Sequence, residues 1–182
     1  MRICILMGSP KMEGNTARLC KSIIEELEAH NADIEYITLH GKNITPCIGC
    51  HKCQNAIGEY GCIFEDDMQG IVDVILKADV LVFATPIYTW QATTPMKAVM
   101  DRMYGLNKFY GEAPREVLNQ GQKYALLATH GYDADYAAGP LNEVMRRWAE
   151  HSGLDYLGMY GVKDEAKDVA KNILNKLTPS LG

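Results

Sequence analysis

Residues 2–16 read RICILMGSPKMEGNT, an apolar run that ends in a turn containing two glycines. The run at residues 2–7 is apolar on both faces, which is typical of a central strand in a parallel sheet covered by helices on both sides. The turn leads into a segment of helical spacing. One apolar stripe runs along that segment, formed by Leu19, Cys20, Ile23, Ile24 and Leu27. A strand, a turn and a helix in this order predict the first unit of an α/β fold.

The same alternation recurs along the chain. Further strands are predicted at residues 33–39, 79–84, 123–129 and 154–160, the first and last of them at the sheet edges because they are more polar. Apolar stripes predict helices around residues 68–76, 96–103, 141–148 and 166–177. Thr94 and Pro95 are expected to cap and to begin the third helix.

Five strands that alternate with five helices predict a parallel sheet with helices on both faces, a flavodoxin-like three-layer sandwich. A six-stranded nucleotide-binding sheet usually needs more than 182 residues, so the predicted strand order is 2-1-3-4-5. No linker interrupts the chain, which predicts one domain over residues 1–182 with a cysteine-containing loop at residues 43–65. Ligands of such sheets bind at the carboxyl ends of the strands, here the loops at residues 8–15, 85–94 and 129–139.

Composition and charge argue against several classes of protein. The net charge is −5 and no basic run occurs, which argues against nucleic acid or an anionic membrane as a partner. Six cysteines in 182 residues are too few for a disulfide scaffold. The apolar run at residues 3–7 is too short for a signal peptide or a membrane span. We therefore expect a cytoplasmic protein with reduced thiols.

The first loop has the chemistry of an anion site. It places backbone N–H groups and the positive end of a helix dipole at the ligand edge of the sheet. Ser9, Asn15 and Thr16 add short polar groups, and Lys11 adds a positive charge. The loop has neither a nucleoside-triphosphate nor a dinucleotide motif, so a terminal monophosphate fits best. The alternative is an ordinary turn in which Asn15 or Thr16 caps the helix.

Three groups of motif residues carry a family resemblance. They are Gly8-Ser9-Pro10-Lys11 with Gly14-Asn15-Thr16, then Pro46-Cys47 through Cys62 with Asp66-Asp67-Met68, then Thr85-Pro86-Ile87-Tyr88 with Lys97 and Asp101-Arg102. In order and spacing, the first hundred residues resemble the flavodoxin-like NAD(P)H-dependent FMN reductases and iron-sulfur flavoproteins. The resemblance implies that Ser9, Lys11, Asn15 and Thr16 hold the FMN phosphate, that Pro86, Ile87, Tyr88 and Trp90 lie along the flavin, and that the protein is a homodimer or tetramer.

Aromatic side chains in the second loop agree with a flavin site. Tyr88 and Trp90 offer a flat apolar surface, although they could instead pack on the following helix or in a subunit interface. Thr129, His130 and Gly131 of the third loop are expected near the pyrimidine edge of the ring, where Gly131 lets the backbone approach. His130 would stabilise negative charge on reduced flavin, or simply face water.

Four cysteines follow the second strand. Cys47, Cys50 and Cys53 are three residues apart and Cys62 comes later, a pattern that could hold a 4Fe-4S cluster. Reduced thiols without a metal, or a zinc ion, are the alternatives left open. Cys4 and Cys20 are expected in the core. The charges of Lys97, Asp101 and Arg102 are expected to form solvated or interface ion pairs.

These features predict an FMN-dependent oxidoreductase that moves electrons from NAD(P)H to a small acceptor such as a quinone, an azo compound, a metal oxyanion or free flavin. The alternative is an iron-sulfur flavoprotein that accepts electrons from ferredoxin through a 4Fe-4S cluster. A third reading is a regulatory or scaffolding module without flavin, in which the first loop is only a turn.

Overall fold

The computed structural model describes residues 1–112 and 115–175 of the chain. Its middle layer is a five-stranded parallel sheet, made of β1 (Arg2–Met7), β2 (Asp33–Thr38), β3 (Val80–Pro86), β6 (Lys123–Thr129) and β7 (Asp155–Tyr160). The strands lie in the order β2-β1-β3-β6-β7. This order confirms the predicted 2-1-3-4-5 sheet, because β4 and β5 belong to a separate ribbon.

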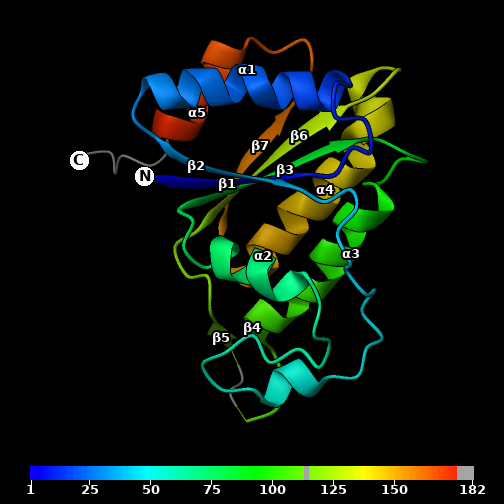
Figure 1. Ribbon diagram of the computed structural model, residues 1–182, viewed down its shortest axis with the longest axis vertical. Coiled ribbons are helices and arrows are strands. Elements are labelled where there is room, and N and C mark those ends of the chain that lie inside the picture. Colours follow the sequence, from blue (N-terminus) through cyan, green and yellow to red (C-terminus); the bar gives the residue numbers. More distant parts are fainter. Residues whose placement is uncertain (113–114, 176–182) are drawn as a thin grey trace.

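Helices cover both faces of the sheet (Figure 1). On one face lie α1 (Asn15–Ala29) and α5 (Ala166–Asn175), and on the other lie α2 (Met68–Ile75), α3 (Thr94–Arg102) and α4 (Ala134–Ser152). The predicted position 177 of the last helix lies outside the described residues.

Strand β1 shows why the sequence forms this sandwich. Side chains alternate between the faces of a strand, so Ile3, Ile5 and Met7 enter the core under α1 and α5, while Cys4 and Leu6 enter the opposite core. All five are fully buried. In contrast, β2 and β7 keep exposed positions, as expected for the edge strands.

Two excursions from the alternating pattern pack against each other below the sheet (Figure 1). The first runs over residues 39–67 between β2 and α2 and contains the short helix η1 (Lys52–Asn55). The second follows α3 and contains η2 (Met103–Leu106), β4 (Asn107–Lys108) and β5 (Glu116–Val117). Sequence periodicity does not predict these elements because each is only two to four residues long.

Across the described part of the chain, no helix combines the length and the apolarity that crossing a membrane requires.

Candidate functional site

The first loop ends in an open helix N-terminus. Helix α1 begins after Gly14, and no side-chain hydrogen bond caps it within the described structure. The capping by Asn15 or Thr16 expected for an ordinary turn is therefore wrong, because Gly14 occupies the cap position. The loop is held in shape by its own groups, since the Lys11 amide donates to Ser9 Oγ at 3.1 Å and the Gly14 amide donates to the Lys11 carbonyl at 3.1 Å. Uncapped N–H groups at a helix N-terminus are suited to an anion.

Buried hydroxyl groups connect the three loops. Thr16 Oγ1 lies 2.7 Å from Thr129 Oγ1, which joins the first loop to the third. Thr93 Oγ1 donates to the Gly8 carbonyl at 2.7 Å, which joins the second loop to the first. The helix cap expected at Thr94 is instead Thr93, because Thr93 has the extended cap conformation and α3 starts one residue later, with Pro95 in the first turn. No side-chain bond caps α3 in the described residues, since the Thr93 hydroxyl is already used by Gly8.

The second loop contains a tight turn that presents aromatic side chains. Tyr88 and Gln91 exchange two backbone hydrogen bonds of 3.0 Å, and the residues between them, Thr89 and Trp90, both have a positive φ of 50° and 60°. Two left-handed residues in a two-residue turn are usually Asn and Gly, so Thr89 in particular is strained there. Tyr88 and Trp90 remain about half exposed. Strain of this kind is concentrated at functional sites.

The third loop lies beside this turn. His130 Nδ1 is 2.8 Å from the Tyr132 carbonyl, and Asp133 caps α4 by accepting from the Asp135 and Tyr136 amides. The Trp90 and Tyr136 rings meet edge to face with 5.8 Å between centroids. A cavity of about 150 Å³ is lined by residues of both loops, among them Ile87, Trp90, His130 and Gly131.

A larger groove adjoins the third loop on its other side. Its volume is about 810 Å³, and residues 128, 130–134 and 159–164 line it. Tyr132 is 77% exposed at its rim. Tyr132 and Tyr136 are not among the site residues predicted from the sequence, although two aromatic residues within seven positions of the end of a buried strand were a usable signal.

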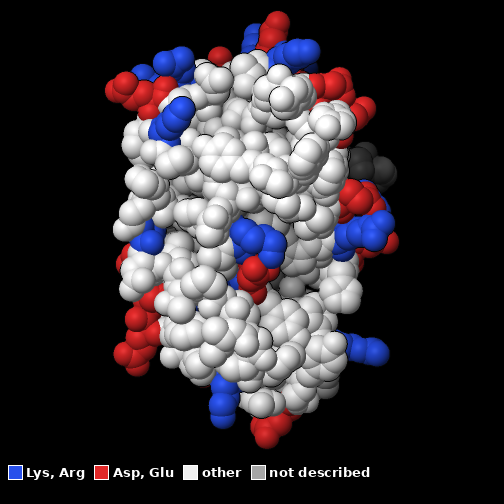
Figure 2. Space-filling model, turned by 90° about the vertical axis from the view of Figure 1, so that its right-hand side faces the viewer, with Lys and Arg blue, Asp and Glu red and all other residues white. Residues whose placement is uncertain are grey.

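The carboxyl ends of the strands point to the right in Figure 1, and Figure 2 shows that side of the molecule. Most of its surface is formed by uncharged residues, with charged side chains gathered mainly toward the rim. The open ends of the loops therefore lie on a face with little charge of its own.

The four cysteines of the first excursion lie around one cavity. Cys47 and Cys50 are exposed, Cys53 and Cys62 are half-buried, and all four line a space of about 30 Å³. Burial raises the pKa of the Cys53 thiol. In the residues that the structure describes, no three Cys, His, Asp or Glu side chains are arranged as a ready-made metal site. Four cysteine sulfur atoms are the ligand type that a 4Fe-4S cluster requires, but in this conformation the four thiols do not point at one common centre. Cys4 and Cys20 are buried in the core as expected, and burial raises the pKa of each to about 12.

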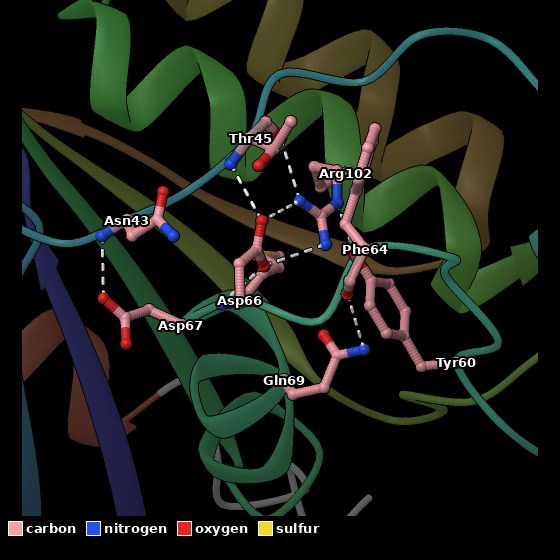
Figure 3. Close-up of polar contacts among 9 residues, drawn as sticks. Asn43, Thr45, Tyr60, Phe64, Asp66, Asp67, Gln69 and Arg102 are labelled. Carbon is pink, nitrogen blue, oxygen red and sulfur yellow. Dashed lines mark hydrogen bonds and ion pairs between the residues drawn. The ribbon is translucent and has the colours of Figure 1, made fainter.

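Arg102 anchors residues 45–66, which we call the cysteine segment, contrary to the expectation that it forms a solvated or interface ion pair (Figure 3). Its guanidinium group is buried and pairs with both oxygens of Asp66, Nη1 to Oδ2 at 2.8 Å and Nη2 to Oδ1 at 3.1 Å. It also donates to the Thr45 carbonyl at 2.8 Å and to Tyr60 Oη at 3.2 Å. The expectation failed because helix spacing does not reveal that the excursion folds over this face of α3. Lys97 and Asp101 do form a half-exposed pair, at 2.6 Å.

Asp66 is a structural carboxylate. Burial would raise its pKa, but hydrogen bonds from Arg102 and from the Thr45 and Met68 amides outweigh burial and lower the pKa to about 2. The carboxylate is therefore ionised at neutral pH and fixes the end of the cysteine segment to the start of α2.

A second buried cation holds the same segment. Lys108 is fully buried, and its Nζ donates to the carbonyl oxygens of Cys53 at 2.7 Å, Glu59 at 2.8 Å and Gly105 at 2.7 Å. Burial lowers the pKa of this ammonium group. The sequence does not predict that Arg102 and Lys108 are buried, because lysine and arginine side chains are usually exposed and their partners here are distant in sequence.

Two solved structures illustrate the similarity of this fold to known proteins. An NAD(P)H:quinone oxidoreductase from Methanothermobacter marburgensis superimposes with a TM-score of 0.67 at 19% identity, covering 96% of this chain and 92% of that one. A flavodoxin of Streptococcus pneumoniae TIGR4 gives a TM-score of 0.59 at 14% identity, covering 97% of this chain and all of that one. At these identities the similarity establishes the fold.

Curated relatives are similar in sequence. An iron-sulfur flavoprotein of Archaeoglobus fulgidus is 30% identical over 148 residues, which cover 81% of this chain and 64% of that protein. An iron-sulfur flavoprotein of Methanocaldococcus jannaschii is 31% identical over 102 residues, 56% of this chain and 51% of that protein. The chain thus spans about half to two thirds of the length of these relatives. The sequence profile of the family described as NADPH-dependent FMN reductase matches residues 1–153, and the chain belongs to that family.

Proposed function

We propose that the protein is an FMN-dependent oxidoreductase that takes electrons from NADH or NADPH and passes them to a small acceptor, such as a quinone, an azo compound, a metal oxyanion or free flavin. One observation carries the proposal. The uncapped N-terminus of α1 at Gly14 is joined to the third loop by the hydrogen bond between Thr16 and Thr129. The second and third loops together present exposed aromatic rings. A phosphate fits the first element and a flat ring fits the second.

The residues present fit FMN by donor chemistry. Ser9, Asn15 and Thr16, with the first amides of α1, would surround the phosphate, and Lys11 would balance part of its charge. Pro86, Ile87, Tyr88 and Trp90 would line one side of the ring, and Thr129, His130 and Gly131 its polar edge. Bound FMN would supply hydride acceptance and electron release. The described protein groups bind, orient and shield the cofactor.

His130 has a defined part in this proposal. Its Nδ1 lies 2.8 Å from the Tyr132 carbonyl, a distance that suits a donating Nδ1–H and fixes the ring. The other ring nitrogen, Nε2, then faces the region near Gly161. His130 would thereby orient the backbone of the third loop at the polar edge of the cofactor.

The binding test compares FMN with riboflavin, which lacks the phosphate. We expect apo-protein to bind FMN with saturable quenching of flavin fluorescence. Lys11→Met should weaken the affinity for FMN about tenfold and leave the affinity for riboflavin unchanged. Lys21→Met, an exposed lysine further along α1, is the matched control and should change neither. Failure of the wild-type protein to bind FMN would refute the proposal.

The electron-transfer test uses the FMN-loaded protein without oxygen. Mixing with NADH or NADPH should bleach the yellow absorbance, and added quinone should restore it. An FMN-loaded protein that neither nucleotide bleaches would contradict the reductase function but not FMN binding.

The second candidate is an iron-sulfur electron carrier that receives electrons from ferredoxin. Its support is that Cys47, Cys50, Cys53 and Cys62 surround one cavity whose walls two buried cations hold in place. Residues 47–62 would have to adjust for four thiolates to bind a 4Fe-4S cluster. Anaerobic purification followed by iron and sulfide analysis decides between the candidates, because four irons per chain would favour the carrier and none would exclude it.

We further propose a cytoplasmic homodimer or tetramer. The sparsely charged face around the loops would be partly covered by a neighbouring copy (Figure 2). Light scattering of FMN-loaded protein tests this point, and a monomer at micromolar concentration would contradict it.

A further inference from the structure

A pocket lined by aromatic rings lies between helices α3 and α4 and the two excursions, and Cys47 and Lys97 are among its other lining residues. Its volume is about 600 Å³, and its wall contains Tyr104, Phe109, Tyr110, Trp148 and His151. We call this space the aromatic pocket. Small-molecule sites commonly have volumes of about 300 to 1,000 Å³ and mostly apolar walls, so its size and lining suit a small organic ligand.

The α4 side of the aromatic pocket lies away from the third loop. Along α4, Val144 comes eleven residues after the capping Asp133, and Trp148 fifteen residues after it. At 1.5 Å per residue these positions are about 16 and 22 Å from the third loop. The opposite side of the pocket is formed by α3, where Lys97 lies three residues after the end of the second loop. The pocket therefore adjoins the second loop, but its aromatic wall is a different surface from the one proposed for FMN.

The rings of the wall pack against one another in tilted pairs, and part of the wall is exposed. Phe109 and His151 are tilted by 36° with centroids 4.5 Å apart, and Phe109 and Tyr104 by 37° at 5.9 Å. Tyr110 is 62% exposed and Val144 41%, so part of the wall has no protein covering it in the described chain. A planar aromatic molecule can stack on such rings, with about 0.5 to 1.5 kcal/mol per ring pair beyond simple burial.

One polar group in the wall has no partner. Asn107 is 2% exposed, and its Nδ2 donates to Ser152 Oγ at 2.8 Å, but its Oδ1 accepts no hydrogen bond from any described residue. Buried acceptors without partners are rare in folded proteins and call for an explanation. Asn107 lines the aromatic pocket but its Oδ1 is buried, so a ligand with an O–H or N–H group supplies the missing donor when the amide turns toward the pocket.

We propose that the aromatic pocket binds a planar aromatic molecule bearing a hydroxyl or amino donor, stacked on the Tyr104, Phe109 and Tyr110 side of the wall and hydrogen-bonded to Asn107. A phenol or a hydroquinone has this chemistry, whereas a quinone has only acceptor oxygens at the same positions. The pocket is therefore expected to prefer aromatic ligands that carry an O–H or N–H group over ligands of the same ring shape that lack one.

The test uses 1-naphthol, with 1-methoxynaphthalene as the matched compound that has the same rings and no donor. By calorimetry, 1-naphthol should bind with one site per chain and about fivefold more tightly than 1-methoxynaphthalene, the ratio expected for one hydrogen bond. Saturating FMN should not change its affinity. Absence of saturable binding at millimolar 1-naphthol, or equal affinity of the two compounds, overturns the proposal.

Two surface variants locate the bound molecule. Val144→Glu places a carboxylate at the exposed edge of the aromatic pocket and should weaken the binding of 1-naphthol at least tenfold. Val162→Glu makes the same change at an exposed valine in the groove beside the third loop and should have no effect. The reverse pattern, or competition by FMN, would place the compound at the flavin loops and refute the aromatic pocket.

The two tryptophans of the chain provide an independent readout. Trp148 lines the aromatic pocket, whereas Trp90 lies in the second loop. In Trp90→Phe, emission comes from Trp148 alone, and 1-naphthol should quench it along the same saturation curve that calorimetry gives. Unchanged Trp148 emission during saturable binding would contradict the assignment.

Discussion

The hydroxyl groups of Thr16 and Thr129 lie 2.7 Å apart and join the N-terminus of α1 to the carboxyl end of β6 across 113 positions of sequence. Both residues are buried, at 2% and 6% exposure. This contact sets the spacing between the loop proposed for the phosphate and the loop proposed for the polar edge of the flavin.

The Thr16 and Thr129 hydroxyls should therefore be energetically coupled. Thr16→Val and Thr129→Val keep the side-chain shape, and each should lower the free energy of unfolding by about 1 to 3 kcal/mol because it leaves the other hydroxyl without its partner. The double variant should lose less than the sum, with a coupling energy of about 1 kcal/mol. Urea denaturation of the four proteins measures this, and strict additivity would show that the contact contributes nothing.

The buried Arg102–Asp66 pair should be essential for stability. Arg102→Met removes one partner and leaves the Asp66 carboxylate without its main counter-charge, which typically costs about 3 to 5 kcal/mol. Lys97→Met, which breaks the half-exposed pair one turn earlier in α3, should cost at most about 1 kcal/mol. Equal losses in the two variants by denaturant unfolding would contradict the difference in burial.

Asp66 also predicts an acid-sensitive contribution to stability. Its pKa falls from an ordinary value of 3.8 to about 2 in the folded protein, so the ionised form stabilises the fold above about pH 4. That contribution is lost as the pH falls toward 2. The stability difference between wild type and Asp66→Asn should shrink by at most about 2 kcal/mol over this range. A difference that is constant from pH 5 to about pH 2 would rule out the lowered pKa.

The turn between Tyr88 and Gln91 should gain stability when its strain is removed. Thr89 is β-branched and has a φ of 50°, so Thr89→Gly should raise the free energy of unfolding by up to about 1 kcal/mol. Thr94→Gly, at the start of α3 with ordinary helical geometry, should instead lower it by up to about 1 kcal/mol. Thermal unfolding of both variants checks the opposite signs, and a loss in both would show that the turn is unstrained.

The sheet was predictable because its signals are local and strong. Strands such as β1 are apolar on both faces, which only a sheet covered on both sides accommodates, and the strand order follows from the number of units. The helices that follow have clear apolar stripes. The positions of the three loops at one edge then follow from the parallel direction of the strands.

The excursions were not predictable for a physical reason. Arg102 and Lys108 are fixed by carbonyl oxygens and a carboxylate that lie 36 to 57 positions away in sequence, and no periodicity encodes such contacts. The turn at Thr89 and Trp90 was missed because its residues lack the Asn-Gly pattern by which such turns are recognised. The Thr94-Pro95 pair also placed the cap of α3 one residue late, because threonine occupies both positions 93 and 94 and the sequence alone does not choose between them.

Arg102, the last residue of α3, contacts both ends of the cysteine segment through Thr45 and Asp66, and Lys108 contacts its middle through the carbonyl oxygens of Cys53 and Glu59. Residues 45–66 therefore cannot open without breaking bonds that residues 102–108 also need. We therefore expect the two stretches to form one cooperative unit, whose amide protons exchange with solvent through a shared opening event rather than by independent fraying. Oxidation of the cysteines should then change amide exchange at the end of α3 as well as in the cysteine segment.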